Sequence, residues 1–190
     1  MGQPNVGKSA FFNRVAGTSV AESNYPGTTV DYSIGHMRVE GSDIEIIDVP
    51  GIFSIRPKDR AEEVAVKLLE EEKEATVICV IDATKIERGL YLALEIIEKG
   101  YPVLIALNMW DMLKRANIKV DSKRMEYILG VPVVSTIASR GEGFKDIALR
   151  MKEVKPVNIE DIKTRANTLH NNFDNGMNNI ACANCLKCMI

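Results

Sequence analysis

The residues best suited to chemistry lie near the start of the chain, where residues 2–9 (GQPNVGKS) match the pattern G-x-x-x-x-G-K-[ST]. Glycines at the two fixed positions let the backbone curl so that several N–H groups point at one phosphate. A helix predicted over Lys8–Ala16 adds the positive end of its dipole. Lys8 would then bridge two phosphates, and the Ser9 hydroxyl would ligate Mg²⁺. The spacing therefore predicts a site for a nucleoside triphosphate.

A second phosphate element is predicted at Asp48-Val49-Pro50-Gly51, directly after an apolar strand. The Asp48 carboxylate would hold a water bound to Mg²⁺, and the Gly51 N–H would meet the γ-phosphate. The pattern Asp-x-x-Gly alone is weak, since it is a common strand-ending turn. Its position one hairpin after the helix that starts at Lys8 favours the functional interpretation.

Between these two elements lies Thr18–Tyr32, a long segment with little secondary-structure signal. Loops of this length in a small domain are usually functional or disordered. Thr29, with Thr28 as the alternative, would complete the Mg²⁺ shell when a γ-phosphate is present. The segment is therefore predicted to be an order–disorder switch.

A base-binding element is predicted at Asn108-Met109-Trp110-Asp111, which follows the apolar run Pro102–Leu107. The Asp111 carboxylate would accept hydrogen bonds from guanine N1–H and the exocyclic amine, a donor pair that adenine lacks. Asn108 would bind this loop to residues 2–9, the phosphate loop. A backbone N–H from Ile137–Ser139 would reach guanine O6. The pattern predicts GTP rather than ATP.

The elements that must position these residues alternate between strands and helices. Buried parallel strands are predicted at Ile44–Asp48, Thr76–Asp82, Pro102–Leu107 and Pro132–Ser135. Ser33–Glu40 is predicted to pair with the first of them as a hairpin. Helices are predicted at Lys8–Ala16, Asp59–Lys73, Arg88–Lys99, Asp121–Leu129 and Gly143–Glu153. This alternation predicts a three-layer α/β fold, a mostly parallel sheet with one antiparallel hairpin strand.

The charge and the apolar content of the chain argue against nucleic acid as a partner and against a transmembrane segment. The 190 residues are 46% hydrophobic and 26% charged, with a net charge of −2, which leaves no electrostatic footprint for nucleic acid. No run of about 18 apolar residues occurs, so no transmembrane segment is predicted and the chain alone is expected to be soluble and cytoplasmic. Residues 1–154 are predicted to form one domain. Lys155–Ile190 is Asn-rich without an apolar period and is predicted to be a linker or a poorly ordered tail.

Three cysteines in this tail, Cys182, Cys185 and Cys188, have a spacing that suits thiolate ligation of Zn²⁺, iron or an iron–sulfur cluster. A closed ligand set is not visible, because His170 is the one nearby candidate for a fourth ligand. We expect three free thiols and assign no metal there.

In this order, the motifs resemble those of P-loop GTPases such as Era, EngA and the MnmE G domain. Longer strings of residues resemble the G domain of FeoB-type ferrous-iron transport protein B, over about residues 2–151. The strings that carry this resemblance are Ser23–Val30 (SNYPGTTV), Asp82–Thr84 with Glu87–Leu92, Ala106–Asp111 (ALNMWD) and Leu129–Val134 (LGVPVV). The resemblance implies slow, Mg²⁺-dependent GTP hydrolysis by a G domain. That domain would regulate Fe²⁺ passage through a membrane transport domain, at the cytoplasmic face of the cell membrane.

Two further expectations come from the resemblance. Asn5 matches the family asparagine associated with K⁺ stimulation, where K⁺ would offset charge in the transition state. Ile52 stands where Ras-like proteins have a water-orienting glutamine, so backbone groups would place the water and turnover would be slow. The family also has an apolar strand before the phosphate loop. Without this first strand, the sheet would lose a middle element and the loop would lose support.

Catalytic roles are predicted for Lys8, Asn5, Thr29 and Gly51. Mg²⁺ ligands are predicted at Ser9, Thr29 and Asp48, and a K⁺ ligand at Asn5. The residues predicted to contact GTP or GDP are Gly2, Gln3, Pro4, Asn5, Val6, Gly7, Lys8, Ser9, Ala10, Gly27, Thr28, Thr29, Asp48, Val49, Pro50, Gly51, Asn108, Met109, Trp110, Asp111, Ile137, Ala138 and Ser139. The alternatives are a GTP-dependent switch with negligible hydrolysis, a ribosome- or tRNA-linked GTPase of the Era, EngA or MnmE type, and an inactive fragment.

Overall fold

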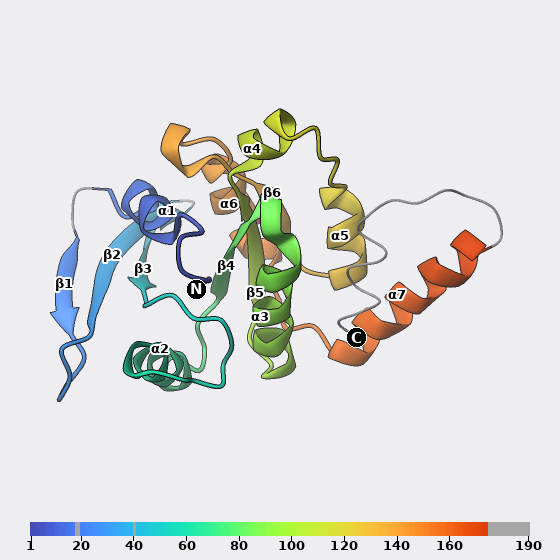
Figure 1. Cartoon of the computed structure of the whole chain (residues 1–190). Helices are drawn as coiled ribbons and strands as arrows, with labels where there is room; N and C mark the ends of the chain where they lie inside the picture. The colour runs from blue at the N-terminus through green and yellow to red at the C-terminus, as the bar shows by residue number, and fades with distance from the viewer. Residues whose placement is uncertain (18–19, 40, 175–190) are drawn as a thin grey trace.

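Strands of the computed structural model, which describes residues 1–17, 20–39 and 41–174, form two three-stranded sheets (Figure 1). In one sheet β4 (Val77–Asp82), β5 (Val103–Asn108) and β6 (Val133–Ser135) pair in parallel. In the other, β1 (Ala21–Asn24), β2 (Asp31–Val39) and β3 (Ser42–Asp48) pair antiparallel.

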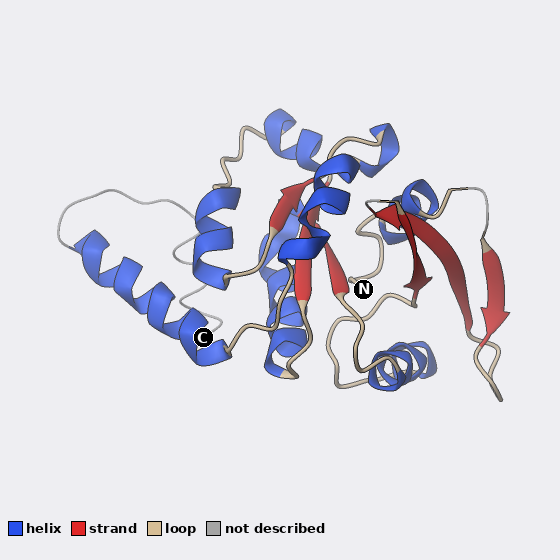
Figure 2. Cartoon of the chain, turned by 180° about the vertical axis from the view of Figure 1, so that it is seen from behind, coloured by secondary structure: helices blue, strands red, loops and turns tan. Residues whose placement is uncertain are grey.

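The parallel sheet is the middle layer of the fold, because β5 is buried along its whole length. Val103, Ile105 and Leu107 face a core shared with α2, α3, α5 and α7, whereas Leu104 and Ala106 face a second core shared with α1 and α6. A strand with apolar side chains on both faces needs such cover on both sides. Helices accordingly lie on both faces of this sheet (Figure 2). The α/β prediction is confirmed, but Ile44–Asp48, predicted as a buried parallel strand, belongs to β3, which pairs antiparallel with β2 and is largely exposed.

The described helices are α1 (Lys8–Val15), α2 (Arg60–Glu71), α3 (Ile86–Glu98), α4 (Trp110–Arg115), α5 (Ser122–Leu129), α6 (Phe144–Arg150) and α7 (Ile159–Asp174). Aspartates cap two of them: Asp59 accepts from Glu62 N at 2.9 Å, and Asp121 accepts from Arg124 N at 2.9 Å. Gly130 ends α5 in the left-handed conformation that glycine adopts without strain.

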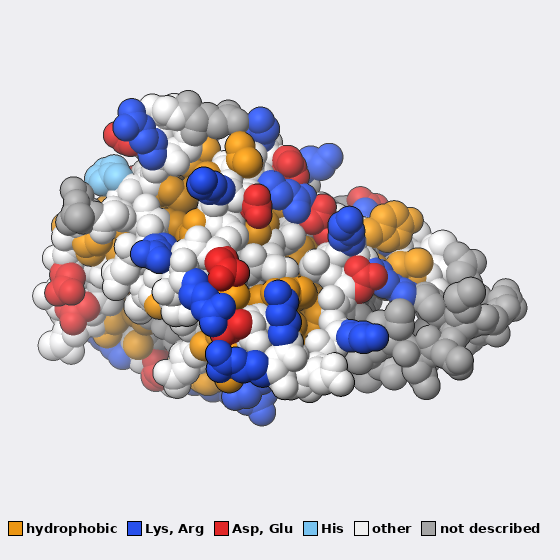
Figure 3. Space-filling model, turned by 90° about the horizontal axis from the view of Figure 1, so that it is seen from above, with side chains coloured by type: hydrophobic (Ala, Val, Ile, Leu, Met, Phe, Trp, Pro, Cys, Tyr) orange, Lys and Arg blue, Asp and Glu red, His pale blue; other side chains and the backbone are white. Residues whose placement is uncertain are grey.

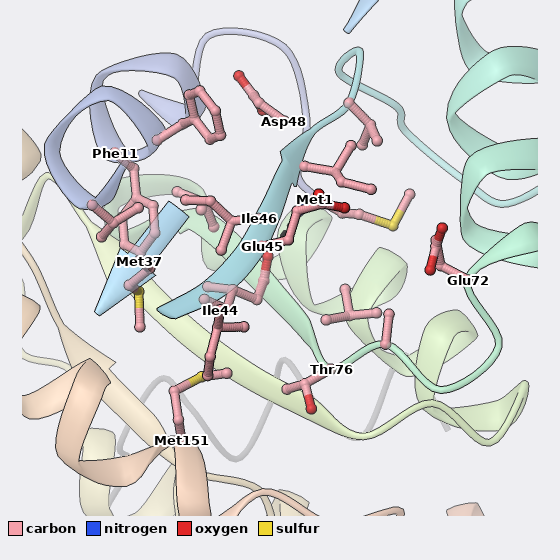
Figure 4. Close-up of a pocket in the computed structure, with 18 of the residues that line it drawn as sticks. Met1, Phe11, Met37, Ile44, Glu45, Ile46, Asp48, Glu72, Thr76 and Met151 are labelled. Carbon is pink, nitrogen blue, oxygen red and sulfur yellow. Dashed lines mark hydrogen bonds between the residues drawn. The ribbon is translucent and has the colours of Figure 1, made fainter. Parts of the chain in front are cut away.

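A gap separates β3, at the edge of one sheet, from β4, at the edge of the other. The first two residues of the chain pair with β4 at this gap: Gly2 forms a parallel bridge to Val80, and Met1 O accepts from Val80 N at 2.9 Å. Phe11, Met37 and side chains of β3 line the cavity of about 830 Å³ that remains (Figure 4). The sequence predicts one sheet that lacks its first strand. In the structure there are two sheets instead, and they are separated where that strand would lie, between β3 and β4.

A helix, α7, occupies part of the region predicted to be a linker or a poorly ordered tail. Its apolar residues Ile159, Ile162, Ala166 and Leu169 pack against the larger core at helical spacing, and Ile162 is fully buried. Arg165 fastens the helix to the end of α5, because its Nε donates to Ile128 O at 2.8 Å. These four apolar residues are widely separated by polar ones, which is why the sequence alone shows no clear helical period here. Residues 175–190, including Cys182, Cys185 and Cys188, lie outside the described part, as does the side chain of His170.

The docking of α7 can be tested at Ile162. Replacing it with alanine removes a fully buried side chain, so we expect Ile162→Ala to lower the free energy of unfolding by about 2–4 kcal/mol. Urea unfolding measures this loss. Asn167→Ala, at an exposed position of the same helix, is the control and should change stability by less than about 0.5 kcal/mol. Equal effects of the two substitutions would show that α7 is not docked.

Candidate functional site

The loop between Gly2 and Lys8 has the curled backbone that its glycines predict. Asn5 and Gly7 both have positive φ, at 65° and 83°. At Gly7 a Cβ would collide with the Asn108 side-chain amide, so the residue is limited in size as well as in conformation. Helix α1 begins at the next residue, so the free N–H groups of its first turn open onto the loop.

Lys8 and Asp48 bring opposite charges together at this loop. The Lys8 ammonium lies 2.8 Å from Asp48 Oδ1, and the two side chains are only 13% and 12% exposed. Asp48 is the last residue of β3, so the register of the hairpin sheet sets its position. The site therefore contains the Lys8 ammonium, a cation that can pair with phosphate, and the Asp48 carboxylate, an oxygen donor of the kind that Mg²⁺ prefers.

The segment after Asp48 rests directly on the phosphate loop. Ile52 N donates to Gly2 O at 3.1 Å, and a Cβ on Gly51 would strike the backbone of Pro4. Ile52 itself is fully buried, so its side chain faces the core and not the phosphate site. The Asp48–Gly51 segment and the phosphate loop therefore lie directly against each other.

Two buried glutamates hold the loop from Phe53 to Lys58, and neither is among the residues predicted from the sequence. Glu62 accepts from Phe53 N at 3.1 Å and from Lys58 N at 2.8 Å. Glu95 accepts from Ser54 Oγ at 3.0 Å and from Ile55 N at 3.1 Å. Glu62 stands three residues after the N-cap of α2, a spacing typical of capping boxes, which was an available signal. A lone acid on the apolar face of α3 was the corresponding signal for Glu95.

Asn108 joins three segments that are far apart in the sequence. Its Nδ2 donates to Val6 O at 2.9 Å, and its Oδ1 accepts from Ala138 N at 2.9 Å. The buried Thr136 hydroxyl lies 3.4 Å from the same oxygen, a contact that the sequence analysis did not predict. Because Asn108 is only 3% exposed, these bonds are shielded from water. The phosphate loop, the Asn108–Asp111 loop and the Ile137–Ser139 loop are thus held side by side.

Asp111 lies in the first turn of α4, where a carboxylate interacts favourably with the helix dipole. The turn starts at Met109, whose φ of 60° reverses the chain after β5. Arg115, one helical turn further on, has its Nη2 3.9 Å from Asp111 Oδ2 and is well exposed. Figure 3 looks onto this end of the molecule and shows basic side chains scattered among acidic ones.

Thr29, together with Gly27 and Thr28 of the same turn, is the part of the predicted site that the structure does not bring to the rest. It lies exposed in the turn between β1 and β2, and Ser33, four residues later, is paired with Asp48. The pairing of β2 with β3 ends at Ser33, and the chain before it runs past the end of β3, so Thr29 lies beyond the strand end that carries Asp48. Thr28 is engaged within the turn, since its Oγ1 donates to Tyr25 O at 2.9 Å.

The part of the chain that the structure describes shows neither a cluster of metal ligands nor a membrane-spanning helix. No group of three or more His, Cys, Asp or Glu side chains in that part of the chain could hold a metal ion. None of its helices combines the length and apolar character needed to cross a membrane.

Known proteins resemble this chain over most of its length. It is 38% identical over 149 residues to the Fe(2+) transport protein A/Fe(2+) transporter FeoB fusion protein of Porphyromonas gingivalis, covering 77% of this chain and 18% of that protein. It is 34% identical over 148 residues to the Fe(2+) transporter FeoB of Leptospira biflexa, covering 77% and 21%. The chain therefore spans about a fifth of the length of these curated relatives.

Solved structures resemble the fold as well. A mutant of S. thermophilus NFeoB bound to GDP matches with a TM-score of 0.76 and 37% identity, covering 83% of this chain and 61% of that one. The cytosolic domain of the T. maritima FeoB iron transporter in its GMPPNP form matches with a TM-score of 0.76 and 36% identity, covering 80% and 60%. A family model described as ferrous iron transport protein B matches residues 1–151. The chain therefore belongs to the ferrous iron transport protein B family.

Proposed function

We propose that this chain binds GTP and GDP and hydrolyses GTP slowly with Mg²⁺, as the regulatory G domain of a ferrous-iron transport system. The observation that carries the proposal is the Asn108 side chain, which fixes the phosphate loop beside the base loop. The S. thermophilus and T. maritima structures, which hold GDP and GMPPNP, support the choice of a guanine nucleotide.

The base would lie between the Asn108–Asp111 loop and the Ile137–Ser139 loop. Asp111 would accept from guanine N1–H and the exocyclic amine. Ala138 N already donates to Asn108, so the Ser139 N–H, at the start of a short 3₁₀ turn, would be the donor to O6. An adenine ring would leave the Asp111 carboxylate without donors, and it is therefore rejected.

At the phosphate end, the Lys8 ammonium would leave its ion pair with Asp48 and bind the β- and γ-phosphates. Ser9, Asp48 and Thr29 supply oxygen donors that suit Mg²⁺, which would neutralise charge on the phosphates. The Gly51 N–H would meet the γ-phosphate. Because the Ile52 side chain is buried, backbone groups would place the attacking water, which favours slow turnover.

The relatives are iron transporters, and this chain corresponds to about a fifth of their length. We therefore propose a membrane transport domain as the partner, with the nucleotide site at the cytoplasmic face. The buried Ile52 also favours the second candidate, a GTP-dependent switch with negligible hydrolysis. Family membership argues against the Era, EngA and MnmE type.

Base selection by Asp111 can be tested with Asp111→Asn. The amide cannot accept from both guanine donors, but its NH₂ can donate to the C2 carbonyl of xanthine. We expect GDP affinity to fall on the order of 100-fold or more and xanthosine diphosphate affinity to rise. Displacement of a fluorescent nucleotide measures both affinities. Asp146→Asn, at an exposed position on α6, is the control, and an Asp111→Asn protein with unchanged preference would overturn the assignment.

The role of Asn5 can be tested by single-turnover GTP hydrolysis in KCl and in NaCl. We expect hydrolysis to be faster in KCl by on the order of tenfold or more, because a bound K⁺ offsets developing charge. Asn5→Gly should abolish this difference while leaving GDP affinity within a few fold, since glycine keeps the positive φ without strain. GTP binding without hydrolysis in either salt would favour the switch.

A further inference from the structure

The turn that carries Thr29 is fastened to α2 from both ends of that helix. Tyr25 Oη donates to Glu71 Oε1, in the last turn of α2, at 2.6 Å. From the first turn, Arg60 Nη2 donates to Gly27 O at 3.4 Å. The Tyr25 ring also packs against the larger core. Figures 1 and 2 both show this turn beside α2.

Internal hydrogen bonds make the turn one unit. Tyr25 N donates to Val30 O at 3.0 Å, and Thr28 N donates to Tyr25 O at 3.0 Å. The Thr28 hydroxyl accepts from Val30 N at 3.2 Å. Because these bonds enclose Thr29, that residue moves only when Tyr25 moves with it or when the turn opens.

We propose that the Tyr25–Glu71 hydrogen bond is a latch that holds Thr29 away from Ser9 and Asp48, which makes Tyr25 a positioning residue for the switch. This inference rests on the proposed function, in which Thr29 joins the metal site when a γ-phosphate is bound. GDP lacks that phosphate, so GDP binding leaves the latch closed. GTP binding has to break it.

The latch also connects the turn to the other phosphate-sensing segment. Helix α2 follows Gly51 through the loop that Glu62 and Glu95 hold. A γ-phosphate contact at Gly51 that shifts α2 would therefore move Glu71 relative to Tyr25. The bond from a phenol to a carboxylate is charge-assisted, and it is the main reason that the pKa of Tyr25 is raised.

Tyr25→Phe tests the latch, because it removes the hydroxyl and keeps the ring. We expect the affinity for GMPPNP to rise about 3- to 10-fold, and the GDP affinity to stay within about twofold. Glu71→Gln keeps an oxygen acceptor without the charge and should give a smaller rise. The matched control is Tyr127→Phe, at a tyrosine of α5 that is 60% exposed. An unchanged GMPPNP affinity, or an equal rise for GDP, would overturn the latch.

Amide hydrogen exchange of the nucleotide-free protein gives a second readout. Tyr25→Phe should speed exchange of the Tyr25 and Thr28 amides about 3- to 10-fold, because the turn opens more often without the latch. Unchanged exchange would contradict the latch whether or not nucleotide binds. If the wild-type chain bound neither GDP nor GMPPNP, the proposed function would fail, and exchange alone would decide the latch.

Discussion

The Asn108 side chain is the contact on which the whole site depends. It is a buried amide whose two ends bond to Val6 O and Ala138 N, on loops more than 100 residues apart in the sequence. Each of those backbone groups would cost about 1–3 kcal/mol if it were left buried without a partner. The bonds therefore fix the distance between the loop proposed to bind phosphate and the loop proposed to bind the base. Preorganisation of this kind lowers the entropic cost of binding.

The other side of the site is formed by the hairpin sheet and the segment after it. A cavity of about 830 Å³ separates this sheet from β4. The Lys8–Asp48 ion pair and the Ile52–Gly2 hydrogen bond connect this side to the phosphate loop and α1. The residues that would bind the base follow the carboxyl ends of β5 and β6, and Asn108 bonds the loop that would bind the first phosphates to them. Those that would sense the γ-phosphate, Gly51 and Thr29, lie next to strands of the hairpin sheet. Such a division suits a domain whose output depends on the third phosphate.

Much of this arrangement could be predicted from the sequence, because buried parallel strands are continuous apolar runs and the motifs follow their carboxyl ends. The strand β5 and the loop after it are the clearest case. Strand β1 was missed because Ala21–Asn24 has no apolar alternation and forms along the edge of β2. The spacing of Glu62 after Asp59 and the apolar neighbours of Glu95 single out these two acids, but they do not show which loop backbone groups each one accepts from, because that depends on tertiary contacts. The division of the sheet beside Val80 follows from pairing across the fold, which no local pattern encodes.

We propose that the loops joined by Asn108 form a pocket that selects guanine, and isothermal titration of the wild-type chain with GDP and with ADP, in Mg²⁺, is the direct test. We expect GDP to bind at least about 1,000-fold more tightly than ADP, because an adenine ring leaves the Asp111 carboxylate unpaired. Equal affinities for the two nucleotides in folded protein would contradict it.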